Sequence, residues 1–364
     1  MKKGLPFPGT NGGLHRHQPP GGGRTLVTRS EMVTLGLELG VFLCALALFL
    51  LHNRPGWQPL VGDLSINFVA LIVEAMPFMV IGSMAGGILE VFVPQERFGR
   101  FLSGRSATTV FLAGGLGLLA PVCECAIVPV VRRLLRKGVP LGGAIAFLLA
   151  GPIVNVIVAW STAVAYRLDW TIVLTRLACG YGIAILVALT MDRLFTVTQA
   201  TRDSLWTIHH QACACCGHDH QQTQRPLRMR MGEAVSHACE DFFEVGRYLV
   251  IGAFIAALTR STVSMETFGI LMTSPGLAIL LMMALAILLN LCSEADAFIA
   301  ASFRTVLPLS SQMAFMVLGP MLDIKLVLMY LSFLRKRAII TLSLLTFTSV
   351  LLAMLALEYL AGGR

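Results

Sequence analysis

Long apolar segments separated by short basic connections dominate this chain. The segments lack the apolar and polar alternation of a transmembrane barrel, so helices are the remaining way to satisfy backbone polar groups within a bilayer. Several approach the roughly 20 apolar residues that cross about 30 Å of hydrocarbon: Val33–Leu51, Phe68–Val93, Leu141–Ala165, Thr171–Met191 and Thr341–Leu357. The pattern predicts an all-α polytopic membrane protein with about 8–10 membrane segments.

Composition excludes a water-soluble globule. Hydrophobic residues make up 56% of the 364 residues, the mean hydropathy is +0.76, and only 13% of residues are charged, against roughly 25% in soluble domains. The net charge of +8 is distributed in the connections between apolar segments, so no nucleic-acid partner is expected. The phosphate-binding pattern Gly-x-x-x-x-Gly-Lys-Ser/Thr is absent from the sequence, so no nucleotide cofactor is expected.

The chain contains an internal repeat in its pattern of residues. Pro140, Phe147, Gly151-Pro152 and Asn155 recur, at a constant spacing, as Pro308, Phe315, Gly319-Pro320 and Asp323. With one or two residues of slippage, the match extends upstream to Cys123 and Cys292 and to Glu74 and Glu244. The series predicts two related halves, as in many transporters.

Charge in the connections suggests how the halves are oriented. If Thr108–Val131 crossed the membrane once, basic clusters would lie on both sides, against the positive-inside rule. If it enters and returns, most of the 28 Lys and Arg residues lie on the cytoplasmic side. Each half then crosses an odd number of times, which predicts inverted repeats. Pro121 and Pro129 flank the proposed break in this segment; an ordinary proline-kinked span is the alternative.

The pattern divides the chain into four parts. Residues 1–30 are predicted to be a disordered arm rich in Gly, Pro and His. Residues 31–190 form the first transmembrane half, with a repeat core at 68–190. Residues 191–240 form a cytoplasmic loop rich in His and Cys, and residues 241–364 form the second half.

The first candidate site is a cysteine and glutamate motif in each half. Cys123, Glu124 and Cys125 place two thiols and a carboxylate within three residues, which suits a soft or borderline ion or a metalloid. The corresponding residues of the second half are Cys292, Glu294 and Asp296. Acids inside a membrane are costly and should face a cavity. Alternatively, the cysteines are packing residues and the acids cap broken helices.

Further polar residues lie in the apolar segments at equivalent places. Asn155 and Asp323 could line the same cavity or satisfy backbone groups released by the preceding prolines, with Lys325 as a counter-charge to Asp323. Glu74 and Glu244 could relay protons or bind a coupling cation. A structural pairing of Glu244 with Arg247 is the alternative.

The second candidate site is a metal-binding loop. Its candidate ligands, suited to Zn or Cu, are His209, His210, Cys213, Cys215, Cys216, His218 and His220. Seven ligands exceed the four of a tetrahedral site, and their spacing matches no finger-type pattern. The alternative is a flexible polar linker.

The two cysteine motifs resemble those of a known family. The stretch from Ala120 through Cys123-Glu124-Cys125 to Arg133, the stretch Gly151–Asn155 and the stretch Cys292–Phe303 closely resemble the bacterial predicted permease family. That broad family includes organoarsenical permeases and metal-efflux proteins, so the resemblance implies a permease. Many members carry Cys-Ser-Cys-Gly where this chain has Cys123 to Ala126; members with Glu often act beside a second membrane protein.

These observations favour a multi-pass permease of the cell inner membrane over an enzyme. It would move a soft metal ion or metalloid species outward through a site at mid-membrane, with lipid and the transported solute as partners. A second membrane protein or another copy of the chain is a further expected partner. Two alternatives are a membrane thiol or redox protein using Cys123 and Cys125, and a non-transporting subunit of a larger complex.

Overall fold

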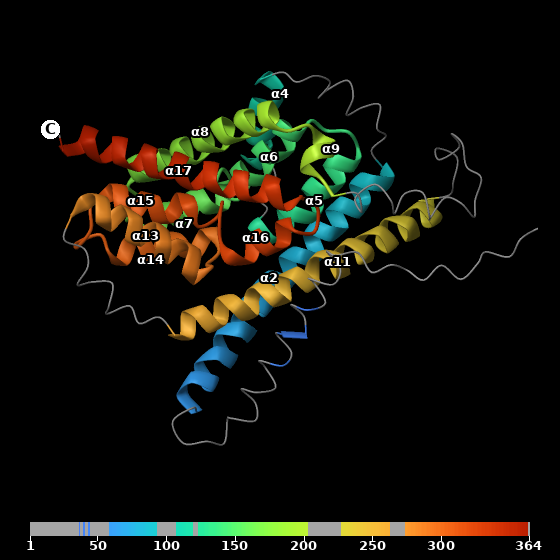
Figure 1. The fold of residues 1–364 in the computed structure, drawn as a ribbon, viewed down its shortest axis with the longest axis horizontal. Coiled ribbons are helices and arrows are strands. Elements are labelled where there is room, and N and C mark those ends of the chain that lie inside the picture. Colours follow the sequence, from blue (N-terminus) through green and yellow to red (C-terminus); the bar gives the residue numbers. More distant parts are fainter. Residues whose placement is uncertain are drawn as a thin grey trace, which may run out of the picture. The chain divides into compact units, whose positions relative to one another are not determined.

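The structure is a computed structural model in which helices account for almost all of the described residues. It describes residues 36, 39–40, 43, 58–92, 107–118, 123–202, 227–262 and 274–362. Contacts divide the chain into Met1–Cys44 and Ala45–Arg364, and the helices labelled α2 to α17 all belong to the second unit (Figure 1). No β-strand occurs within the described ranges, so the predicted all-α fold is confirmed.

The helices form two series with the same order of long and short elements. The first series is α2 (Gln58–Phe92), α4 (Ala107–Gly115), the 3₁₀ turn η1 (Leu116–Leu118), α5 (Glu124–Arg136), α6 (Leu141–Ala150), α7 (Val156–Ala165) and α8 (Trp170–Leu194). After the short α9 (Val197–Ala200), the second series is α11 (Leu227–Thr262), α13 (Pro275–Leu289), α14 (Ser293–Ser302), α15 (Leu309–Leu318), α16 (Ile324–Tyr330) and α17 (Lys336–Gly362). Helix α11 already begins inside the segment 191–240 that the sequence pattern assigned to a loop.

Helix length separates spanning helices from partial ones. Within the described residues, α2, α8, α11 and α17 are long and apolar enough to cross a membrane, and five shorter apolar helices accompany them. The stretch Leu141–Ala165, predicted as one segment, is divided into α6 and α7. Helix α6 ends at Gly151-Pro152, and a new helix begins at Asn155 because its side chain caps the first turn of α7.

The break predicted before α5 is present, but its extent was predicted wrongly. Cys123 is the N-cap of α5, so a new helix does begin at the cysteine motif. Pro129 lies inside α5 and does not end it. A proline costs the helix one backbone hydrogen bond, but α5 is buried on most sides, so packing against its neighbours holds the helix together. With 13 residues, α5 is about 20 Å long and too short to cross about 30 Å of hydrocarbon.

Helices α2 and α11 pack side by side and run antiparallel (Figure 1). Asn67, near the start of α2, donates to Ser261, near the end of α11, at 3.4 Å. At the other end Arg230 donates to the carbonyl of Val91 at 3.2 Å. The backbones approach closely because Gly87 has no side chain: a Cβ there would lie 2.2 Å from the Ala234 carbonyl oxygen.

Equivalent helices make equivalent contacts within each series. Helix α4 packs on α6 as α13 packs on α15, and α6 packs on α8 as α15 packs on α17. Between the series, α5 contacts α16 and α7 contacts α14, so the starts of short helices from both series meet in the interior. The duplication itself stays a prediction.

Candidate functional site

The cysteine motif of the first series meets the start of α16. Lys325 Nζ donates to Glu124 Oε1 at 3.2 Å and lies 3.9 Å from Asp323 Oδ2. All three side chains are buried, at 5% exposure or less. The predicted counter-charge to Asp323 therefore also binds the glutamate of the cysteine motif. We call Cys123, Glu124, Arg176, Asp296, Asp323 and Lys325 the junction.

An asparagine that the sequence pattern did not single out positions Lys325. Asn290 ends α13 in the left-handed conformation, with φ of 49°, a role that Asn tolerates well. Its amide donates to the carbonyls of Ile287 and Leu288, and its Oδ1 accepts from the backbone N–H of Lys325 at 3.0 Å. The side chain thereby joins the end of α13 to the start of α16.

Arg176 was also missed as a site residue, because the sequence only placed it in a span. Its guanidinium is fully buried and donates to Thr162 Oγ1 at 2.7 Å, to the Ser293 carbonyl at 2.8 Å and to the Met316 carbonyl at 3.1 Å. It thus links α7, α8, α14 and α15. A buried cation held by neutral acceptors alone is costly, and Asp296 and Glu294 are the acids that act on it electrostatically.

Thiols from both motifs lie close to these charges. Cys123 and Cys125 are within hydrogen-bonding reach of each other, and Cys292 is within reach of Glu74 and Glu294. Glu124 acts electrostatically on Cys292, Glu294 and Asp296. Cys123, Cys125 and Cys292 are free thiols.

Several buried polar atoms of the junction have no hydrogen-bond partner in the described part of the chain. They are Glu124 Oε2, Asp296 Oδ2, Asp323 Oδ2 and Arg176 Nε. Asp296 Oδ2 lies against Gly319, where a Cβ would come within 2.5 Å of it. An unpartnered buried polar atom costs about 1–3 kcal/mol, so water, a proton or a solute at these positions would stabilise the protein.

The two capping positions serve the backbone. Asn155 Oδ1 accepts from the Val158 N–H at 2.8 Å, and its amide donates to the Gly151 carbonyl at 3.4 Å. Asp323 Oδ1 accepts from the Leu326 N–H at 2.5 Å. Both residues therefore have the structural role that the sequence left open, and a role in transport stays a prediction.

The intramembrane acids Glu74 and Glu244 have different surroundings. Glu74 lies on an exposed face of α2, near Cys292. The interpretation of Glu244 as a partner of Arg247 was wrong: Glu244 accepts from Arg132. Position 132 projects from α5 toward α11, whereas the Arg247 guanidinium stacks on the ring of Tyr248, 4.9 Å from its centroid.

A second set of buried charges lies at the end of α5. Arg132 contacts Asp241 and Glu244, and Arg133 donates to Asp241 and to the His237 carbonyl. Both arginines are at most 2% exposed. We call these four charged residues the arginine cluster. It fixes α5 to α11.

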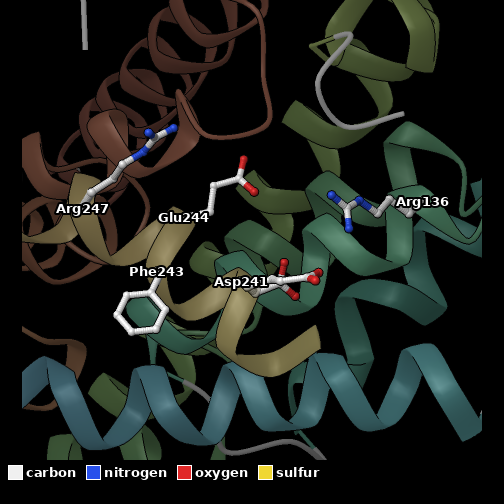
Figure 2. A pocket seen from close by; sticks show the side chains of 6 residues that line it. Arg136, Asp241, Phe243, Glu244 and Arg247 are labelled. Carbon is white, nitrogen blue, oxygen red and sulfur yellow. The ribbon is translucent and has the colours of Figure 1, made fainter. Parts of the chain in front are cut away.

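A cavity of about 480 Å³ opens beside the arginine cluster (Figure 2). Its lining residues are Arg136, Glu240, Asp241, Phe243, Glu244 and Arg247. Arg136 is the last residue of α5, outside the four spanning helices. Burial, followed by the charges of Arg132 and Arg133, lowers the pKa of Arg136 to about 10.

The second predicted site lies outside the described residues. The ligands His209, His210, Cys213, Cys215, Cys216, His218 and His220 all fall in the range 203–226, which the structure does not describe. Within the described ranges, no group of three or more His, Cys, Asp or Glu side chains is arranged to hold a metal ion.

Comparison with known proteins places the chain among membrane permeases. A family model described as "Predicted permease" matches residues 63–359. The "UPF0718 protein YcgR" of Bacillus subtilis is 37% identical over 270 residues, which cover 74% of this chain and 88% of the relative. The "Putative two-component membrane permease complex subunit" of Streptococcus mutans is 36% identical over 264 residues, covering 72% of this chain and 84% of that protein.

A more distant relative covers less of the chain. The "UPF0718 protein YraQ" of Escherichia coli is 29% identical over 147 residues, which are 40% of each protein. No solved structure matches the chain. The extent of the family match and the identity to the longer relatives confirm the resemblance seen in the cysteine motifs: this chain belongs to the predicted permease family.

Proposed function

We propose that this chain moves a soft metal ion or metalloid species across the cell inner membrane, and that the solute passes through the junction. The observation that carries the proposal is the contact between Lys325 and Glu124, surrounded by buried polar atoms that lack partners. Charged side chains inside a membrane protein mark solute pathways more often than structural positions. Here the charged side chains come from both series of helices, so a movement of one series relative to the other would change their contacts and their access to solvent.

The thiols support a soft solute. Cys123 and Cys125 are adjacent and free, and thiolates prefer soft metals and metalloids to hard cations. A closed chelate of three or four ligands would retain its ion, whereas a transport site must also release it. A site that holds the ion with few ligands at a time can release it more easily. Glu124 and Cys292 would be further contacts along the path of the ion.

The arrangement of the series supports alternating access. Helices α2 and α11, at equivalent places, run antiparallel, and Cys123 and Cys292 are both N-caps of short helices. Inverted halves with broken helices at the centre are a common transporter design. The loop at His209–His220 would bind cargo on the cytoplasmic side, which suits efflux, and Glu74 is the acid placed to exchange protons near Cys292.

Transport by the purified chain in proteoliposomes tests the proposal. We expect uptake of Zn²⁺, Cu⁺ or a trivalent arsenical that falls at least tenfold in the double variant Cys123→Ser/Cys125→Ser. Cys179→Ser is the matched control, because Cys179 is a free, half-buried thiol on α8 outside the junction. Equal uptake by the double variant and the control would refute the thiol site.

A second candidate function is that of a subunit that needs a partner to transport. The name of the Streptococcus mutans relative favours it, because that protein is described as a subunit of a two-component complex. If the chain alone transports none of these solutes, and co-expression with a second membrane protein restores transport that depends on Cys123 and Cys125, the subunit function holds.

A further inference from the structure

The two series of helices meet on both sides of the junction, but they pack more closely on one side. By their order in the two series, α7 corresponds to α16 and α14 to α5. Helices α7 and α14 pack on each other more extensively than α16 and α5 do, and α15 packs on α8 more extensively than α6 packs on α17. The closer side contains the turn between α7 and α8 and the turn between α14 and α15, so the two series hold each other most tightly there.

Tyr166, the C-cap of α7, makes the central contact between these two turns. Its hydroxyl donates to Gln312 Oε1 on α15 at 2.8 Å, and both side chains are buried. Gln312 is fixed in turn, because its amide donates to the Leu307 carbonyl at 2.8 Å. Arg304 lies over the Tyr166 ring, 5.9 Å from the ring centroid, which is within the range of cation–π attraction. Residues of the second series therefore hold the end of α7.

The turn that follows Tyr166 has a strained backbone. Arg167 and Leu168 have φ of 57° and 64°, in the left-handed region that residues other than Gly seldom adopt. The Leu168 N–H donates to the Ala163 carbonyl at 2.6 Å, which holds the turn in this form. Strained residues persist where surrounding contacts over-determine them, and they cluster at segments that switch. Releasing the contacts of Tyr166 would therefore let the turn relax.

Arg176 joins the two series on the same side, at the level of the junction. From α8, its guanidinium donates to the Ser293 carbonyl of α14 at 2.8 Å and to the Met316 carbonyl of α15 at 3.1 Å. Tyr166 and Arg176 thus connect α7 and α8 to the second series at two levels, and Tyr166 is the outer of the two. A movement that opened the junction on this side would have to break the contact of Tyr166.

We propose that the hydrogen bond between Tyr166 and Gln312 is a gate, which closes the junction on this side and opens when α7 moves away from α15. The inference rests on the proposed function, because the gate decides from which side the solute reaches the junction. The positive-inside rule places the basic residues 132–137 in the cytoplasm. The chain then passes through α6 and α7 before it reaches Tyr166, so we expect the gate at the outer face of the membrane.

Labelling of the buried thiols Cys123 and Cys125 from outside tests the gate. A membrane-impermeant maleimide is added to right-side-out vesicles that carry the full chain, and modification of both cysteines is followed by mass spectrometry. Tyr166→Phe keeps the ring and removes only the hydroxyl, so labelling should become about three- to tenfold faster, as expected for the loss of one hydrogen bond. Gln312→Met should act in the same direction. The double variant should label no faster than the faster single variant, because both changes remove the same bond.

Tyr330→Phe is the matched control. Tyr330 is a buried tyrosine at the end of α16, and its hydroxyl donates within its own series, to the Met321 carbonyl at 3.3 Å. Both variants lose a buried hydroxyl and should lower the unfolding temperature to a similar degree, but Tyr330→Phe should label like the parent chain. The gate is refuted if Tyr166→Phe labels no faster than Tyr330→Phe, or if the increase is the same in inside-out vesicles.

Transport measured for the same variants separates the gate from the proposed function. If Tyr166→Phe speeds labelling from one side but the parent chain transports neither Zn²⁺, Cu⁺ nor a trivalent arsenical, the gate holds and the proposed solute is wrong. If the parent chain transports one of these solutes and Tyr166→Phe changes neither labelling nor transport, the gate is wrong and the proposed function holds.

Discussion

The two ends of α5 both bury charge, but they do so differently. At its end, Arg132 and Arg133 contact acids of α11 directly, and each acid of the arginine cluster has an arginine partner, while Nε and Nη1 of Arg132 make no hydrogen bond among the described residues. At its start, Glu124 has one cation, Lys325, and one unpartnered oxygen, and Asp296 and Asp323 each keep an unpartnered oxygen as well, among the described residues. Acids that are all paired with arginines fix helices together, whereas unpartnered carboxylate oxygens leave a position where a cation or a hydrogen-bond donor can bind.

The largest effect is expected from breaking the arginine cluster. Asp241→Asn removes the buried acid that Arg132 and Arg133 share, which leaves Arg133 with only the more distant Glu90 and Glu240 among the described acids, at 3.8 and 4.0 Å. Breaking a buried ion pair by removing one partner costs about 3–5 kcal/mol. The apparent unfolding temperature in detergent should fall strongly. Glu240→Gln, one residue away and 52% exposed, should change the free energy of unfolding by about 1 kcal/mol or less. Equal effects of the two variants would show that the cluster does not fix α5.

A smaller loss of stability is expected from Lys325→Gln at the junction. Glu124 and Asp323 lose their cation, but a glutamine amide at this position can still donate a hydrogen bond to Glu124, so the cost should be about 1–3 kcal/mol. The double variant Glu124→Gln/Lys325→Gln should be more stable than the sum of the single losses predicts, which a double-mutant cycle measures. Simple additivity would mean that the contact contributes nothing. Transport should be lost in all three variants.

Gly319→Ala should affect transport more than stability. A Cβ at Gly319 would lie 2.5 Å from Asp296 Oδ2, so the carboxylate must move, at a cost of about 1–3 kcal/mol. Gly182→Ala is the control, because no atom lies within 4 Å of a Cβ there, and it should be neutral or slightly stabilising. Normal transport by Gly319→Ala would remove Asp296 from the solute path.

The smallest effect is expected at the cap of α7. Asn155→Ala removes the bond to the Val158 N–H and should cost about 1 kcal/mol. Asn155→Asp keeps a capping oxygen and should restore stability. Transport measured for both variants separates capping from solute binding: if Asn155→Asp is stable but inactive, the amide also contacts the solute.

Local features of the fold could be predicted from sequence, and contacts between distant segments could not. Apolar run length identified the helices that became α2, α8 and α17, and the cysteine motif marked the start of α5. The split between α6 and α7 was missed because apolar composition continues through Gly151-Pro152. Local chemistry there, including the capping side chain of Asn155, decides where a helix ends.

The charge pairs illustrate the limit most clearly. The sequence paired Lys325 with Asp323 and Glu244 with Arg247, each within three residues, because local spacing is all that a pattern offers. The structure keeps the first pair, with Lys325 3.9 Å from Asp323, and also joins Lys325 to Glu124, 201 residues away. It replaces the second pair, because Glu244 contacts Arg132, 112 residues away. Arg176 and Asn290 were missed for the same reason: the partners of Arg176, and the Lys325 N–H that Asn290 binds, lie in other helices. Their one sequence signal was a polar residue inside an apolar run.

Helix α5 places these two kinds of contact on one rigid rod about 20 Å long. A displacement at Glu124 that accompanies solute entry would swing the far end of the rod, where Arg132 and Arg133 hold α11, and α11 is packed along α2. In the proposed transport, α5 would therefore act as a lever: opening the centre would pull on the outer pair of helices, and restraining that pair from outside would keep the centre closed.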